Sequence, residues 1–124
     1  MNMAKIPPLL ALLMLTALCL LPEQTLGHAF PDHSEPRVGS TVDRSPDSVR
    51  IWFDGALEAA FCTLSVEDGS GARLDKGDGT VDPADLTLLK VTLPRLPAGT
   101  YHVRWEVLAR DGHRTKGDYS FEIR

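Results

Sequence analysis

The chain has 124 residues, with 13 lysines and arginines against 17 aspartates and glutamates, so its formal net charge is −4. A mildly acidic chain offers no basic surface to neutralise a row of phosphates, which argues against a nucleic-acid partner. The length suits one small domain with a modest core rather than two domains.

The first 27 residues have the pattern of a secretory signal peptide. One positive charge, Lys5, precedes a leucine-rich apolar run from Ile6 to Leu21, and the small residues Thr25 and Gly27 come just before the expected cleavage site. The apolar run is short for a membrane span, which needs about 20 residues, although an uncleaved anchor stays an alternative. We therefore expect cleavage after Gly27, export, and a mature domain of residues 28–124.

The mature part alternates apolar and polar residues in short runs, a pattern typical of half-buried strands. These runs are Val49–Phe53, Cys62–Val66, Leu89–Leu93, Tyr101–Val107 and Tyr119–Ile123. No segment has a helical period over ten or more residues; Ala56–Ala60 and Pro83–Leu86 could each form one helical turn. Several short strands at this spacing predict an all-β antiparallel sandwich or barrel.

Turn residues separate the predicted strands. Asp68–Gly71 and Asp78–Gly79 have the composition of hairpin connections. Tyr101 comes just after a corner formed by Pro97, Ala98 and Gly99. A tyrosine in this position can return its hydroxyl to nearby backbone, as in the tyrosine corner of Greek-key sandwiches.

The first candidate for metal chemistry is His28, directly after the expected cleavage site. An N-terminal histidine offers two nitrogen donors, its α-amine and its imidazole. Their ordinary pKa values are about 7.8 and 6.5, so both can lose protons near neutral pH and chelate a metal ion. A histidine can also begin a secreted protein by an accident of cleavage.

The second candidate is the segment Asp111-Gly112-His113. In extended backbone, residues two apart point to the same face, so a carboxylate and an imidazole could reach one ion. With His28 they would supply three nitrogens and one oxygen, a tetragonal set that Cu(II) prefers. Zn(II) could use the same ligands but prefers a tetrahedral arrangement. The segment is also compatible with a plain turn.

Other candidates have simpler interpretations. His33 and Asp54 could assist the site, but an exposed loop histidine and a strand-end turn residue are expected. His102 alternates with core residues and should face solvent. Cys62, on an apolar face, should be a small core residue rather than a thiolate ligand. The run Asp75–Asp82 lacks the spacing of a calcium-binding EF-hand, which predicts a solvated hairpin.

Several segments together resemble one known family. They are His28-Ala29 followed by Ser34-Glu35-Pro36, then Val49–Phe53, Ala98–Trp105, and Asp111-Gly112-His113 with Gly117–Phe121. This combination is similar to the CopC family of periplasmic copper-binding proteins, and the resemblance covers essentially all of the mature chain.

The resemblance implies a cupredoxin-like or immunoglobulin-like Greek-key β-sandwich. It implies that His28, Asp111 and His113 bind Cu(II) in the periplasm. It also implies a role in copper resistance or homeostasis, as a carrier or buffer, beside an inner-membrane copper transporter of the CopD type. Some members have a further glutamate ligand after the second strand, where this chain has Asp54 and Gly55.

Some members also have a methionine-rich Cu(I) site, whereas every methionine here lies within the first 14 residues. Soft Cu(I) prefers thioether or thiolate ligands, so we expect a Cu(II)-only protein.

Two other functions stay open. A copper oxygenase with a histidine brace also uses an N-terminal histidine, but it needs an open position for oxygen that Asp111 would fill. A metal-free, immunoglobulin-like interaction module explains the strands. It does not explain why His28 and the Asp111–His113 segment occur together, which would then be a coincidence. The sequence has no recognisable nucleophile–base pair or phosphate loop. We therefore expect a copper carrier or buffer and not an enzyme.

Overall fold

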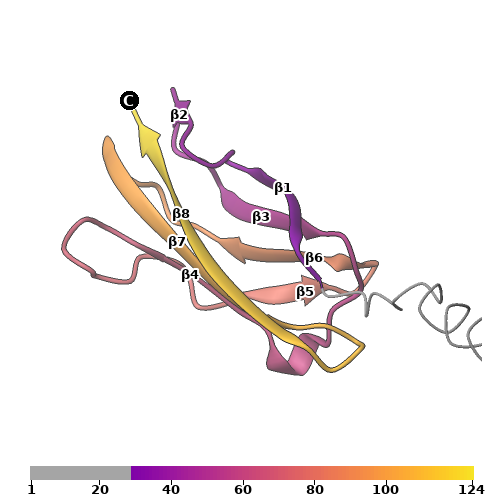
Figure 1. Cartoon of the computed structure of the whole chain (residues 1–124). Coiled ribbons are helices and arrows are strands. Elements are labelled where there is room, and N and C mark those ends of the chain that lie inside the picture. The colour runs from indigo at the N-terminus through magenta and orange to yellow at the C-terminus, as the bar shows by residue number, and fades with distance from the viewer. Residues whose placement is uncertain (1–28) are drawn as a thin grey trace, which may run out of the picture.

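The computed structural model describes residues 29–124, so the expected signal peptide and His28 lie outside the described residues. The described part is built from strands, with one three-residue 3-10 helix (Figure 1). The elements are β1 Pro31–Glu35, β2 Thr41–Val42, β3 Ser48–Phe53, η1 Ala59–Phe61, β4 Thr63–Glu67, β5 Thr80–Asp82, β6 Asp85–Thr92, β7 Gly99–Leu108 and β8 Arg114–Ile123. Between residues 29 and 124 we find no helix long and apolar enough to cross a membrane.

The strands form two four-stranded sheets that face each other (Figure 1). One sheet has the order β1-β3-β6-β5, and the other has the order β2-β8-β7-β4. Neighbouring strands are antiparallel except β2 and β8, which pair in parallel through a two-residue contact. The all-β sandwich predicted from the alternation is confirmed.

The core lies between the two sheets and consists of the apolar residues that alternate along the strands. The most deeply buried side chains are Val49, Ile51, Leu57, Leu64, Val66, Leu89, Val91, Val103, Val107 and Phe121. Burying a side chain of this kind contributes about 1.5–3 kcal/mol. Cys62 belongs to the same cluster, which confirms its predicted place in the core.

The tyrosine corner is confirmed, because the Tyr101 hydroxyl donates a hydrogen bond to the carbonyl of Pro97 at 2.5 Å. The turn at Asp68–Gly71 is also confirmed: it folds the chain back so that Glu67 and Arg73 form an antiparallel bridge. Both features depend on residues close together in the sequence.

Two local predictions between β4 and β6 are wrong. Asp78–Gly79 is no hairpin turn but leads into β5, because the Asp78 carboxylate accepts the backbone N–H of Thr92 on β6. Pro83–Leu86 is not helical: the β5–β6 hairpin turns at residues 83 and 84, where the Asp82 carboxylate accepts the N–H of Ala84. The helical turn expected over Ala56–Ala60 is displaced to η1.

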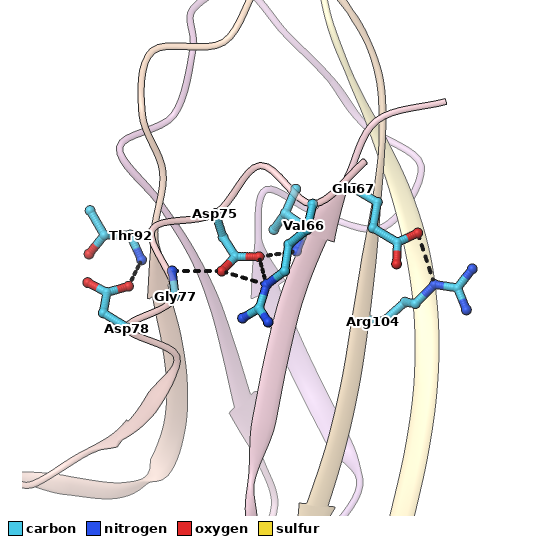
Figure 2. A network of polar contacts seen from close by, with 8 residues as sticks. Val66, Glu67, Asp75, Gly77, Asp78, Thr92 and Arg104 are labelled. Atoms are coloured by element: carbon cyan, nitrogen blue, oxygen red, sulfur yellow. Dashed lines mark hydrogen bonds and ion pairs between the residues drawn. The ribbon is translucent and has the colours of Figure 1, made fainter. Parts of the chain in front are cut away.

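The run from residue 75 to residue 82 is not the solvated hairpin that we expected. The Asp75 side chain is fully buried. Its carboxylate accepts hydrogen bonds from the backbone N–H groups of Val66 and Gly77, each at 2.9 Å, and from Arg73 Nε at 2.9 Å (Figure 2). This carboxylate therefore holds the long β4–β5 connection against β4. At this point the chain passes from one sheet to the other.

Candidate metal centre

Asp111 and His113 lie in the short connection between β7 and β8. This connection is closed by backbone hydrogen bonds from Ala109 N–H to the carbonyl of His113 and from Gly112 N–H to the carbonyl of Ala109, each at 2.9 Å. Gly112 has a φ of +91°, a conformation that L side chains rarely adopt. A turn, and not the extended backbone that we expected, therefore brings the two residues together.

The turn places a carboxylate next to an imidazole. Asp111 Oδ1 lies 3.3 Å from His113 Nδ1 and also accepts the backbone N–H of His113 at 3.0 Å. The two side chains are 22% and 42% exposed, although the His113 Nδ1 atom that faces Asp111 is itself buried. A carboxylate and an imidazole thus lie side by side in this turn, and their joint binding of a metal ion stays a prediction.

Asp111 and His113 do not by themselves make up a metal site. Within residues 29–124, no group of three or more His, Cys, Asp or Glu side chains could hold a metal ion. The third predicted ligand, His28, lies outside the described residues. The donor set of Asp111 and His113 fits a metal ion only if another segment completes it.

The described chain begins beside this turn. Ala29 is fully buried, and its carbonyl accepts a hydrogen bond from Thr115 Oγ1 at 2.9 Å. Thr115 lies on β8, two residues after His113. The next residue, Phe30, exchanges two hydrogen bonds with Asp54: its N–H donates to Asp54 Oδ1 at 2.7 Å, and its carbonyl accepts the Asp54 N–H at 2.9 Å.

These contacts show what Asp54 does in the fold. Its carboxylate accepts the backbone N–H of Phe30, 24 residues earlier, and not that of a neighbour in a local turn after β3 as expected. The contacts themselves join residues 24 and 86 positions apart, so they leave no local pattern in the sequence.

The remaining histidines lie elsewhere. His33 is on strand β1, so the loop that we expected there is wrong. Its ring stacks on Trp52 with centroids 4.5 Å apart, and its Nδ1 lies 2.9 Å from an Asp32 carboxylate oxygen. His102 is exposed, as predicted, with its Nδ1 at 2.8 Å from Ser120 Oγ.

Cys62 is poorly suited to binding a metal. Its thiol donates a hydrogen bond to the carbonyl of Glu58 at 3.2 Å. Burial raises the pKa of the Cys62 thiol, which disfavours the thiolate that metals require. A soft sulfur ligand is therefore not offered by this side chain.

The family model of the CopC domain matches residues 32–124. The match covers most of the chain, which therefore belongs to the CopC family. The crystal structure of CopC from Methylosinus trichosporium OB3b is 30% identical in sequence, with a TM-score of 0.69, over 77% of this chain and 93% of that chain. The crystal structure of PcoC, a methionine-rich copper resistance protein from Escherichia coli, is 25% identical, with a TM-score of 0.68, over 79% of this chain and 100% of that chain.

One relative is much longer. The copper transport protein CutJ of Bacillus subtilis (strain 168) is 27% identical over 113 residues, which are 90% of this chain and 21% of CutJ. The chain thus spans about a fifth of the length of this relative.

Proposed function

We propose that this chain is a periplasmic copper-binding protein that holds one Cu(II) ion through His28, Asp111 and His113. The observation that carries the proposal is the position of Ala29. Its carbonyl accepts a hydrogen bond from Thr115 on β8, two residues after His113 in the β7–β8 connection. Since consecutive Cα atoms are about 3.8 Å apart, the anchoring of Ala29 on β8 supports His28 as the third ligand beside the Asp111–His113 turn.

The donor chemistry supports Cu(II). After cleavage behind Gly27, His28 would supply its α-amine and its imidazole, and His113 and Asp111 would add one nitrogen and one oxygen. Cu(II) favours a tetragonal set of nitrogen and oxygen ligands, and it binds such sites more tightly than other divalent metals of its series do.

The same composition argues against Cu(I). The three methionines lie at positions 1, 3 and 14, so a chain that begins at His28 has no thioether. Its one thiol, Cys62, is buried. The relative PcoC is methionine-rich by description, whereas this chain would exchange Cu(II) without a Cu(I) site of its own.

The names of the relatives suggest the physiological role. One is a copper transport protein and another a copper resistance protein. Both are consistent with a carrier or buffer for copper in the periplasm, acting beside an inner-membrane transporter of the CopD type and carrying out no catalysis of its own.

The decisive experiment uses protein exported with its own leader, with its N-terminus sequenced. Titration with Cu(II) should show one tightly bound equivalent with a tetragonal EPR spectrum. A protein with one alanine added before His28 should lose most of that affinity, because its amine is no longer on the histidine. Replacing the exposed, remote His102 by alanine is the matched control and should change nothing.

Two results would contradict the proposal. Unchanged affinity after the alanine extension would remove the amine from the ligand set. A mature N-terminus at another residue would remove His28 itself from it. Oxygen-dependent turnover of a polysaccharide by the copper-loaded protein would instead favour the oxygenase.

A further inference from the structure

We infer that Asp54 and Thr115 form a clamp that fixes the first residues of the mature chain before copper arrives, and that this clamp raises the affinity of the site. The inference rests on the proposed function, since it concerns how His28 is positioned. Asp54 and Thr115 are positioning residues here: they contact backbone next to His28 and are not themselves proposed as ligands.

The clamp binds a single peptide unit from two sides. Thr115 Oγ1 donates to the Ala29 carbonyl at 2.9 Å, and Asp54 Oδ1 accepts the Phe30 N–H at 2.7 Å. This carbonyl and this N–H belong to the same planar peptide group. Thr115 lies on β8, in one sheet, and Asp54 directly follows β3, in the other sheet. The peptide group is therefore fixed relative to both layers of the sandwich.

Side-chain burial alone does not account for this placement. Phe30 is 52% exposed, so its ring gains little from the core. Ala29 is fully buried but contributes only a methyl group, which lies 3.8 Å from the position that a Gly55 Cβ would take. The side-chain hydrogen bonds from Asp54 and Thr115 therefore add to the backbone bond from the Asp54 N–H to the Phe30 carbonyl in holding residues 29 and 30.

The clamp also connects the two parts of the proposed site. Thr115 is two residues from His113, and the carbonyl that it binds is on the residue next to His28. We therefore expect this hydroxyl to hold Ala29, and through it the residue before it, close to the Asp111–His113 turn. A ligand held in its bound position loses less conformational entropy on binding, so a fixed N-terminus should bind copper more tightly than a loose one.

The test compares two pairs of variants in protein exported with its own leader. Asp54→Ala and Thr115→Val remove the hydrogen-bonding groups, whereas Asp54→Asn and Thr115→Ser retain an acceptor and a donor. Asp43→Ala is the matched control, because Asp43 is an exposed aspartate that pairs with the exposed Arg124 at 3.2 Å. Hydrogen exchange of the Phe30 amide is measured without metal, and Cu(II) affinity is measured by competition with a chelator.

Asp54→Ala and Thr115→Val should each lower the Cu(II) affinity about tenfold to a hundredfold, where each tenfold corresponds to about 1.4 kcal/mol. Both should also speed exchange of the Phe30 amide in the metal-free protein. The Asn, Ser and Asp43→Ala variants should stay close to wild type. The EPR parameters of the bound ion should be the same in all of them, because the ligands are unchanged.

Several outcomes would overturn the clamp. A Cu(II) affinity equal to wild type in both Asp54→Ala and Thr115→Val would overturn it. So would a loss of Cu(II) affinity in Asp54→Asn or Asp43→Ala as large as that in Asp54→Ala. Slow exchange of the Phe30 amide in Asp54→Ala would contradict it independently of copper. If the wild-type protein binds no Cu(II), the proposed function fails, and the exchange measurement still tests the clamp. If Asp54→Ala does not fold, the Val and Ser variants at Thr115 decide the question.

Discussion

Removing the Asp75 carboxylate should destabilise the domain strongly, and the contacts in Figure 2 set the magnitude. In Asp75→Ala, the buried Val66 N–H loses a charged acceptor, a loss that costs about 1.5–3 kcal/mol. The Gly77 N–H and Arg73 are exposed and can bind water in place of the carboxylate. The loss of their two interactions with Asp75 therefore adds less to the cost. We expect a decrease of about 3 kcal/mol in the free energy of unfolding, or about 12–24 °C in Tm for a domain of this size.

Urea denaturation followed by tryptophan fluorescence measures this change. Asp78→Ala is the control, since its carboxylate makes one exposed hydrogen bond to the Thr92 N–H and should cost about 1 kcal/mol. A loss below about 1 kcal/mol in Asp75→Ala would refute the reasoning. It would mean that water replaces the carboxylate at the Val66 amide.

The same carboxylate should make stability depend on pH. Burial raises the pKa of Asp75, but hydrogen bonds from Arg73, Val66 and Gly77 outweigh burial and hold this pKa below its ordinary value. A lowered pKa stabilises the fold above the unfolded-state pKa of about 3.9, and this stabilisation is lost as the pH falls through the folded-state pKa. The stability difference between wild type and Asp75→Asn should therefore be largest near neutral pH and shrink below about pH 4. An equal difference at pH 7 and pH 3 would contradict this assignment.

Three further predictions concern single residues. A Cβ at Gly117 would lie 2.5 Å from the Trp105 ring, so Gly117→Ala should cost about 1–3 kcal/mol in urea denaturation and alter the tryptophan emission; unchanged emission and stability would show that the ring moves freely. Gly112→Ala should destabilise the domain by about 1–2 kcal/mol, because φ is +91° there. It should also lower the Cu(II) affinity by distorting the β7–β8 turn. An unchanged Cu(II) affinity would show that the geometry of this turn does not affect copper binding. Cys62 should react slowly with a thiol reagent at pH 8 and rapidly in urea, because burial raises its pKa; equal rates would place the thiol at the surface.

The features that the sequence predicted correctly depend on neighbouring residues. The alternation along Tyr101–Val107 and Tyr119–Ile123 identifies inward-facing side chains without knowledge of their partners. The hydrogen bond from Tyr101 to Pro97 spans only four residues. The pairing of Asp111 with His113 was also predicted, although Gly112 brings them together through a turn and not through extended backbone.

The features that were missed depend on distant partners. Asp75 is buried because β4 lies beside it, and its own segment looks like a polar loop. His33 belongs to a strand because β1 pairs with β3, a contact that the turn-like residues Pro31 and Asp32 do not suggest. The anchoring of Ala29 through Thr115 joins the two ends of the domain and has no trace in local sequence.

If the chain is exported, as we propose, the burial of Cys62 has a consequence for how it folds. Residues 29–124 contain no other cysteine, so an exposed thiol in an oxidising compartment could form a disulfide only with another molecule. In the folded domain this thiol lies inside the sandwich, at 7% exposure. In an exported chain, oxidative dimerisation would therefore be restricted to the interval between translocation and closure of the two sheets. Conditions that slow folding should raise the yield of disulfide-linked dimer, whereas oxidants should not cross-link the folded protein.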